Sequence, residues 1–131
     1  MATKIKTFEQ ACKVTGDDPN KLPDVSGLSE AMGKAVIALI KLETIRKAIN
    51  GKWIEDYSNS SQWKYFPWLV WVPSRSAFVC TNALYSYTST YLGSRFCFET
   101  RDTARYFGEQ FIDLINDFMA PNKLNANGNK S

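Results

Sequence analysis

Histidine is absent from this chain of 131 residues. Its absence excludes Ser-His-Asp and Cys-His mechanisms, metal sites with imidazole ligands, and the commonest general base near neutral pH. Glu99, Asp102 and Glu109 could supply a carboxylate pair for sugar hydrolysis, but acids on a helix surface are far commoner than catalytic acids. We therefore expect no enzyme, no metal and no cofactor.

Cysteine is scarce: Cys12, Cys80 and Cys97 are the only three, and no two of them form a C-x-x-C pair. This usage predicts small buried thiols in a reducing compartment rather than a disulfide framework or a zinc site. Long apolar runs are missing too, because residues 35–42 contain Lys41 and are too short to span a bilayer. No apolar segment follows the basic N-terminus, so we expect no secretory signal.

Composition is otherwise ordinary, with 44% hydrophobic and 22% charged residues and a net charge of +3. The length suits one domain, which we place at residues 1–121. Residues 122–131 are polar and rich in Asn, which predicts a disordered tail. Deleting this tail is expected to leave the thermal stability unchanged.

Three helices are predicted from caps and apolar spacing. Thr7 with Gln10 forms a capping box for a short first helix, and Ser29 caps a second helix that continues to about Asn50. Thr100 caps a last helix that ends before Pro121. An apolar stripe is expected on the second helix: Met32, Val36, Leu39, Ile40, Leu42, Ile45 and Ile49.

Strands are predicted between the second and the last helix. Residues 63–72 are aromatic and β-branched, with Pro67 indicating an edge position or a bulge. Residues 77–81 and 94–99 form two further expected strands. The predicted fold is α+β: two N-terminal helices, an antiparallel sheet of about three strands, and a C-terminal helix packed on the sheet. The two long helices are expected to cover one face of that sheet.

Acidic residues are missing from positions 57–98, which hold twelve of the eighteen aromatic residues. In residues 63–72 both alternating sets are apolar, whereas helices can cover only one face of a small antiparallel sheet. A core role explains most of these aromatics, but the second face indicates a partner surface. The predicted partner-binding residues are Trp63, Lys64, Tyr65, Trp68, Trp71, Arg75 and Arg95.

Two kinds of partner fit this segment. Another protein chain, a second copy included, would use the aromatic face or an exposed strand edge. Single-stranded nucleic acid would stack on Trp and Tyr while Lys64, Arg75 and Arg95 met phosphates. Protein is favoured, because the segment has only three cations and no recognisable phosphate-binding motif.

Five phrases together resemble a family of small proteins that tailed phages and prophages of Bacteroides-type bacteria carry. They span most of the chain: residues 5–12, 22–25, 64–68, 93–98 and 107–114. The resemblance implies a phage context and assigns no activity and no functional residue. It leads us to expect a virion-associated component, an accessory protein of the capsid or the tail. The expected location is the cytoplasm of the bacterial host or the virion. The expected partners are phage structural proteins or other copies of the chain, and no membrane partner is expected.

Overall fold

The computed structural model describes residues 5–87 and 95–122, where it forms an α+β fold. Most of the predicted tail, residues 123–131, lies outside the described residues, as do residues 88–94. The elements follow the order α1 (Phe8–Thr15), α2 (Glu30–Asn50), β1 (Lys64–Val72), a 3₁₀ turn (Pro73–Arg75), β2 (Ala77–Ser86), α3 (Arg101–Gln110) and α4 (Ile112–Met119).

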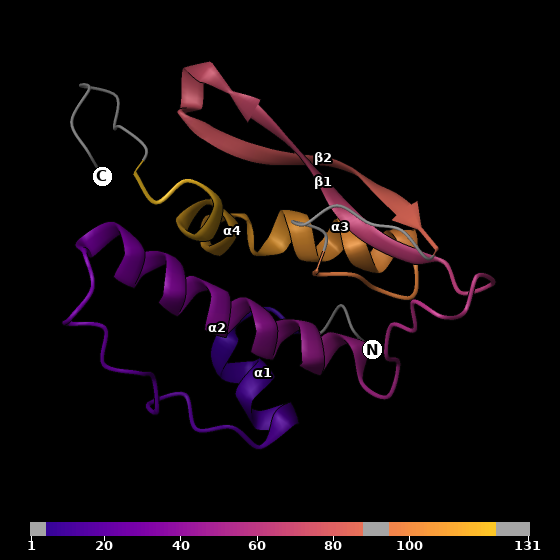
Figure 1. Ribbon diagram of the computed structural model, residues 1–131, viewed down its shortest axis with the longest axis horizontal. Coiled ribbons are helices and arrows are strands. Elements are labelled where there is room, and N and C mark those ends of the chain that lie inside the picture. Colours follow the sequence, from indigo (N-terminus) through magenta and orange to yellow (C-terminus); the bar gives the residue numbers. More distant parts are fainter. Residues whose placement is uncertain (1–4, 88–94, 123–131) are drawn as a thin grey trace.

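The elements form three layers (Figure 1). The β1–β2 hairpin lies on one side, α3 and α4 lie in the middle, and α2 with α1 lies on the other side. Helix α3 packs against both strands, whereas α2 packs against α1 and α4. The expectation that both long helices cover one face of the sheet is therefore correct for the C-terminal helix, through α3, and wrong for α2, which covers the helical layer instead.

The helix starts agree with the predicted caps. The Thr7 hydroxyl accepts the Gln10 N–H at 3.1 Å, and the Ser29 hydroxyl accepts the Met32 N–H at 3.1 Å. The Thr100 hydroxyl accepts the Thr103 N–H at 3.2 Å. Each bond satisfies a backbone donor that the first helical turn leaves free, so these boundaries are set locally.

The C-terminal helix is two helices rather than the single one predicted. Phe111, with φ −110° and ψ 28°, ends α3 and precedes α4. Its side chain stays in the core with 5% of its surface exposed. The break lets α3 follow the strands while α4 packs on α2, which one straight helix would not do.

Helix α2 buries only part of the predicted stripe: Leu42, Ile45 and Ile49 are buried as expected, and the rest of the buried face differs. Met32 is 54% exposed, and small residues occupy much of the buried face. The buried positions are Gly33, Ala35, Ala38, Leu42, Ile45, Ala48 and Ile49. Small side chains let neighbouring segments approach closely: a Cβ on Gly33 would lie 3.1 Å from Val25 Cγ2.

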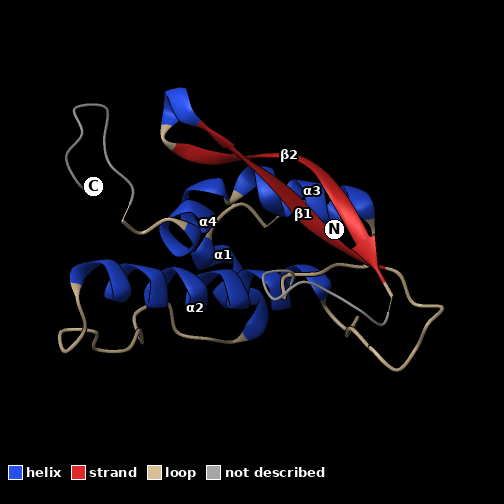
Figure 2. Cartoon of the chain, turned by 45° about the horizontal axis from the view of Figure 1, so that its top comes forward, coloured by secondary structure: helices blue, strands red, loops and turns tan. Residues whose placement is uncertain are grey.

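The sheet has two strands among the described residues, not about three (Figure 2). β1 and β2 are antiparallel, and a bulge between Trp68 and Leu69 inserts one extra residue into β2. The expected third strand is reduced to one bridge, in which Tyr65 and Phe98 exchange backbone hydrogen bonds of 3.0 and 2.7 Å. Residues 96–98 are all buried, so this segment enters the core instead of alternating between two faces.

Aromatic rings form the centre of the core. Phe107 on α3 is fully buried and contacts Phe98 at 4.8 Å, Phe111 at 5.8 Å and Phe96 at 5.9 Å between ring centroids. Leu42 and Ile45 of α2 belong to the same cluster. The core therefore lies between α2, α3 and the 96–98 segment. The hairpin contributes to it mainly through Phe66 and Ala83, which are buried.

Candidate interaction surface

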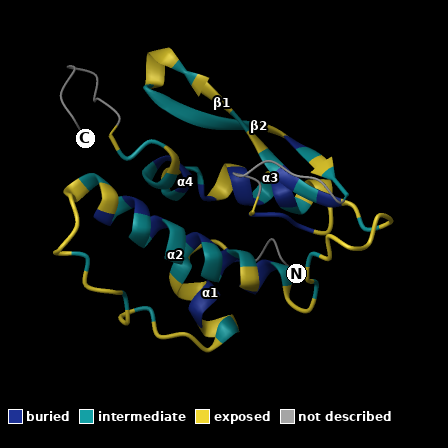
Figure 3. Ribbon diagram, in the orientation of Figure 1, coloured by how far each residue is buried: buried dark blue, intermediate teal, exposed yellow. Residues whose placement is uncertain are grey.

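Several large apolar residues of the hairpin are exposed, and Figure 3 colours parts of both strands as exposed. Trp63, Trp68, Val70, Trp71 and Tyr85 each expose between 41% and 45% of their surface. Trp68 and Val70 lie on one face of β1 and Trp71 on the other, because side chains alternate along a strand. The distal half of the hairpin, which we define as residues 68–80, therefore exposes apolar side chains on both faces.

The opposite end of the hairpin carries an aromatic cluster that is satisfied within the chain. Trp63 stacks on Tyr85 with ring centroids 4.7 Å apart, and Tyr87 meets Trp63 edge-on at 5.3 Å. The Arg101 guanidinium lies over Tyr65 at 5.3 Å and also donates to a carbonyl of β2. These rings already have the stacking and cation–π partners that a ligand would otherwise supply.

An apolar groove lies between the hairpin and α4. Its volume is about 210 Å³, below the roughly 300–1,000 Å³ of usual small-molecule pockets. Its walls include Leu42, Phe66, Leu69, Phe78, Phe118 and Met119. A space of this size suits a single apolar side chain better than a cofactor.

A larger hollow of about 500 Å³ lies at the C-terminal end of α2. Val14, Trp53 and Ile54 contribute apolar walls, and Ile54 is 74% exposed. Arg46 also lines the hollow, and its guanidinium forms ion pairs with Glu43 and with Glu55. The hollow therefore offers no uncommitted guanidinium to an anion.

Lys64, one of the predicted partner-binding residues, is fully buried. Its ammonium donates to the Gln62 carbonyl at 2.9 Å and to the Asn59 carbonyl at 3.5 Å, and it lies 5.1 Å from the Tyr57 ring. Backbone carbonyls and an aromatic face replace the water that the charge loses on burial. In this position Lys64 fastens the preceding loop and does not reach the surface.

The other two predicted cations differ from each other. Arg75 is exposed in the turn between the strands. Arg95 pairs through Nε with Glu43 Oε2 at 3.1 Å, and its side chain is 62% exposed. Arg95 thus belongs to a polar network at the C-terminal half of α2, whereas Arg75 lies beside the distal half of the hairpin.

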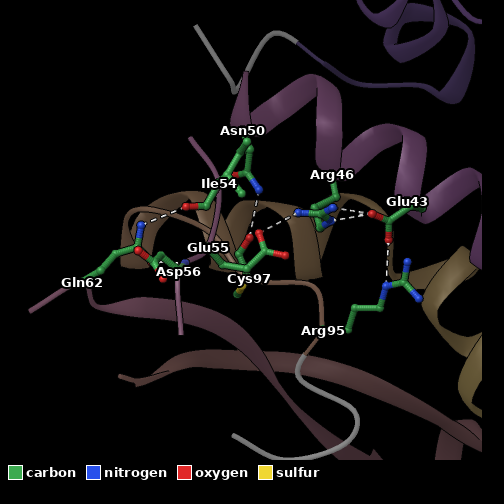
Figure 4. A network of polar contacts seen from close by, with 9 residues as sticks. All are labelled: Glu43, Arg46, Asn50, Ile54, Glu55, Asp56, Gln62, Arg95 and Cys97. Carbon is green, nitrogen blue, oxygen red and sulfur yellow. Dashed lines mark hydrogen bonds and ion pairs between the residues drawn. The ribbon is translucent and has the colours of Figure 1, made fainter. Parts of the chain in front are cut away.

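That network fixes the loops that flank the sheet (Figure 4). Asn50 Nδ2 donates to the Cys97 carbonyl at 3.0 Å, which holds the 96–98 segment on α2. Gln62 donates to the Ile54 carbonyl at 2.9 Å and accepts the Asp56 N–H at 2.7 Å. The network positions Phe98 for its bridge to β1.

The two outer edges of the hairpin are covered differently. On β2, Asn116 of α4 accepts the Phe78 N–H at 2.7 Å and donates to the Phe78 carbonyl at 2.9 Å. On β1, Phe98 covers the edge at Tyr65. Beyond Tyr65, the outward backbone groups of β1 have no backbone partner in the described part of the chain.

Pro67 lies on that same outer edge. Outward groups recur every second residue, so residues 67, 69 and 71 share the outward direction of Tyr65. The missing N–H of Pro67 therefore faces away from β2, and the hairpin loses no hydrogen bond. This geometry agrees with the prediction of an edge position or a bulge, since a bulge also follows Pro67 at Trp68 and Leu69.

Asn116 is a buried polar residue that sequence reasoning did not single out. It is 3% exposed, and its third hydrogen bond goes to the Ile112 carbonyl at 3.0 Å. The exposed Val70 and Tyr85 and the half-buried Tyr87 were not among the predicted partner-binding residues. The ladder register places Tyr85 opposite Tyr65, and a ring contact places Tyr87 edge-on to Trp63.

Replacing Asn116 by alanine should lower the free energy of unfolding by about 2 kcal/mol, because the substitution leaves partly buried backbone groups of β2 without partners. The backbone amide of Phe78 should also exchange with solvent faster. Asn59→Ala is the matched control, since the Asn59 side chain accepts only an exposed loop N–H. Urea denaturation and hydrogen exchange measure both effects, and equal stability of the two variants would contradict the prediction.

The thiols do not resemble nucleophiles. Burial raises the pKa of Cys97 to about 11, and the Glu55 charge adds to the shift. Burial also raises the pKa of Cys12 and of Cys80. A raised pKa keeps a thiol protonated at neutral pH, and the thiolate is the reactive form.

Two further searches covered the described residues alone. Within residues 5–87 and 95–122, no group of three or more Cys, Asp or Glu side chains is placed to hold a metal ion. None of the helices described there is both long enough and apolar enough to cross a membrane.

The chain matches no protein-family model, no curated protein sequence and no solved structure. The functional argument therefore depends on the geometry of the hairpin.

Proposed function

We propose that this chain is a non-enzymatic interaction protein that binds another protein chain through the distal half of its hairpin. The observation that carries the proposal is the exposure of Trp68, Val70 and Trp71 on both faces of one strand. An apolar groove lies beneath the same strand. Tryptophan and arginine are the side chains that most often anchor interfaces, and Arg75 lies in the adjoining turn.

The biological setting follows from the sequence resemblance. A phage context makes a capsid or tail accessory component the natural role for a small protein of this kind. The proposed partners are phage structural proteins or other copies of the chain. The proposed location is the host cytoplasm or the virion.

Single-stranded nucleic acid remains the second candidate, and the cation geometry disfavours it. Lys64 is buried and Arg95 pairs with Glu43, which leaves Arg75 of the three cations in the aromatic segment. The rings of Trp63 and Tyr85 stack on each other. Nucleic-acid binding through phosphates would weaken steeply with salt.

Selection of binders from a random peptide library tests the proposal. Peptides enriched on the wild-type chain should bind Trp68→Ala or Trp71→Ala at least about 30-fold more weakly, the equivalent of a 2 kcal/mol anchor. Met32→Ala, an exposed site on α2, should bind them as wild type does. Both tryptophan variants should keep a melting temperature near that of the wild type.

Three outcomes would contradict the proposal. One is a library that yields no binder, and another is a set of peptides that ignore both tryptophans. The third is strong, salt-sensitive binding of a fluorescent single strand at two salt concentrations, which would establish the second candidate instead.

A further inference from the structure

The outer edge of β1 carries hydrogen-bonding groups in the distal half of the hairpin that no described backbone group uses. The N–H and C=O groups of Leu69 and Trp71 point outward, because they share the phase of Tyr65, which bonds outward to Phe98. The backbone N–H and C=O groups of Val70 point inward, toward its partner Val79 on β2. None of the described backbone groups pairs with Leu69 or Trp71 on the outer side.

Between Pro67 and Pro73, residues 68–72 lack the other features that usually protect an exposed strand edge. Residues 68–72 read WLVWV and contain no charge. Native edge strands are commonly guarded by lysine, by inward-pointing charges or by a covering helix. Here α4 covers β2, through Asn116, and in Figures 1 and 2 the distal half of β1 lies on the side of the hairpin away from α4. Among residues 5–87 and 95–122, no backbone group therefore competes with a second strand for this edge.

We propose that the partner of this edge is the same edge of a second copy, paired antiparallel about a two-fold axis at Val70. In that register Leu69 lies opposite the second copy's Trp71, and the reverse pair is identical by symmetry. Each pair exchanges two backbone hydrogen bonds, so four bonds form. The inference rests on the proposed function and identifies its partner as another copy of the chain.

The positions of two prolines select this register. A two-fold axis at Val70 places Pro67 opposite the second copy's Pro73, so two residues without an N–H face each other just beyond the paired segment. An axis at Leu69 would instead set each Trp71 carbonyl against a proline ring. The strand also ends at Val72, before the second copy could reach the edge that Phe98 covers at Tyr65.

The side chains match as well. Val70 meets its own copy on the axis, and Trp68 lies opposite the second copy's Val72. Aromatic and β-branched cross-strand pairs of this kind stabilise sheets. The exposed parts of Trp68, Val70 and Trp71 amount to on the order of 300 Å² per copy, taking usual aromatic side-chain areas. A stable interface buries about 800 Å² per partner, so the dimer should be weak and concentration-dependent.

Disulfide trapping tests the register. Val70→Cys places two thiols across the axis as a non-hydrogen-bonded pair, whose Cα separation of about 4.5 Å fits a disulfide. Mild oxidation should therefore convert most of this variant into a covalent dimer. Val72→Cys is the matched control, because its two thiols would lie four residues apart, about 13 Å. The wild type measures any background from Cys80.

Sedimentation velocity over a range of concentrations tests the association itself. The wild type should shift from monomer to dimer as its concentration rises, and Val70→Lys should stay monomeric. Val14→Lys should dimerise as the wild type does, because Val14 is an exposed valine on α1, at 60% exposure. A circular-dichroism melt confirms that both lysine variants are folded.

Several results would overturn the self-pairing. They are a wild type that stays monomeric at every concentration, equal trapping of Val70→Cys and Val72→Cys, and a dimer that Val70→Lys does not weaken. If the wild type is monomeric while selected peptides still depend on Trp68 and Trp71, only the identity of the partner is wrong. If those peptides fail too, the proposed function fails with it.

Discussion

Replacing Gly108 by alanine should destabilise the protein by about 2 kcal/mol, and valine should cost more than about 3 kcal/mol, because overpacking a close contact forces the backbone or its neighbours to move. A Cβ at this position would lie 2.5 Å from Cys80 Sγ and 2.8 Å from Pro67 Cβ. The proline ring cannot rotate away. The gain of about 1 kcal/mol in helix propensity from glycine to alanine does not offset that overlap.

Gly27→Ala is the control for this experiment, because a Cβ there would have no atom within 4 Å. Its free energy of unfolding should change by less than about 0.5 kcal/mol. Cys80→Ala in the Gly108→Ala background should recover part of the lost stability. The remaining loss should persist, because the overlap with Pro67 Cβ is unchanged. A Gly108→Ala variant as stable as Gly27→Ala would show that α3 and the hairpin are not in this close contact.

Replacing Phe107 by alanine should have the largest effect on stability, a loss of about 3–5 kcal/mol. The ring is fully buried and contacts Phe96, Phe98 and Phe111, so its removal leaves a cavity among three rings that belong to two segments. The free energy of unfolding from chemical denaturation is the measurement. It should be taken at two protein concentrations, because association would add to the apparent stability.

Phe78→Ala is the matched control for Phe107. Phe78 is half-buried, and its ring contact is an edge-on one with Trp71 at 5.2 Å. We expect a loss of about 1 kcal/mol, the usual size for a partly exposed site. A Phe78 variant as unstable as the Phe107 variant would place the distal half of the hairpin inside the folding core, and would argue against its use as a binding surface.

The sequence by itself determined the features that depend on neighbouring residues. The hydroxyls of Thr7, Ser29 and Thr100 set the three helix starts, because a cap bonds to an N–H three positions along. Pro67 indicated an edge position or a bulge, because a proline has no N–H to donate to a ladder. The pattern of residues 63–72 indicated apolar side chains on both faces of one strand, and the structure exposes Trp68 and Trp71 on opposite faces.

Tertiary structure alone decided how those elements are covered. Periodicity shows which apolar residues share one face of a helix or strand, but not which element packs on that face. It therefore did not predict that α2 packs on α4, or that the last helix ends at Phe111 and a new one begins. Lys64 was predicted at a partner surface but is fully buried, with its ammonium bonded to carbonyls of the preceding loop. In the described part of the chain the edge at Leu69 and Trp71 has no backbone partner, because Phe98 and Asn116 cover the hairpin elsewhere. These contacts join residues more than thirty positions apart. Pairings over such distances depend on the whole fold, which local sequence patterns do not encode.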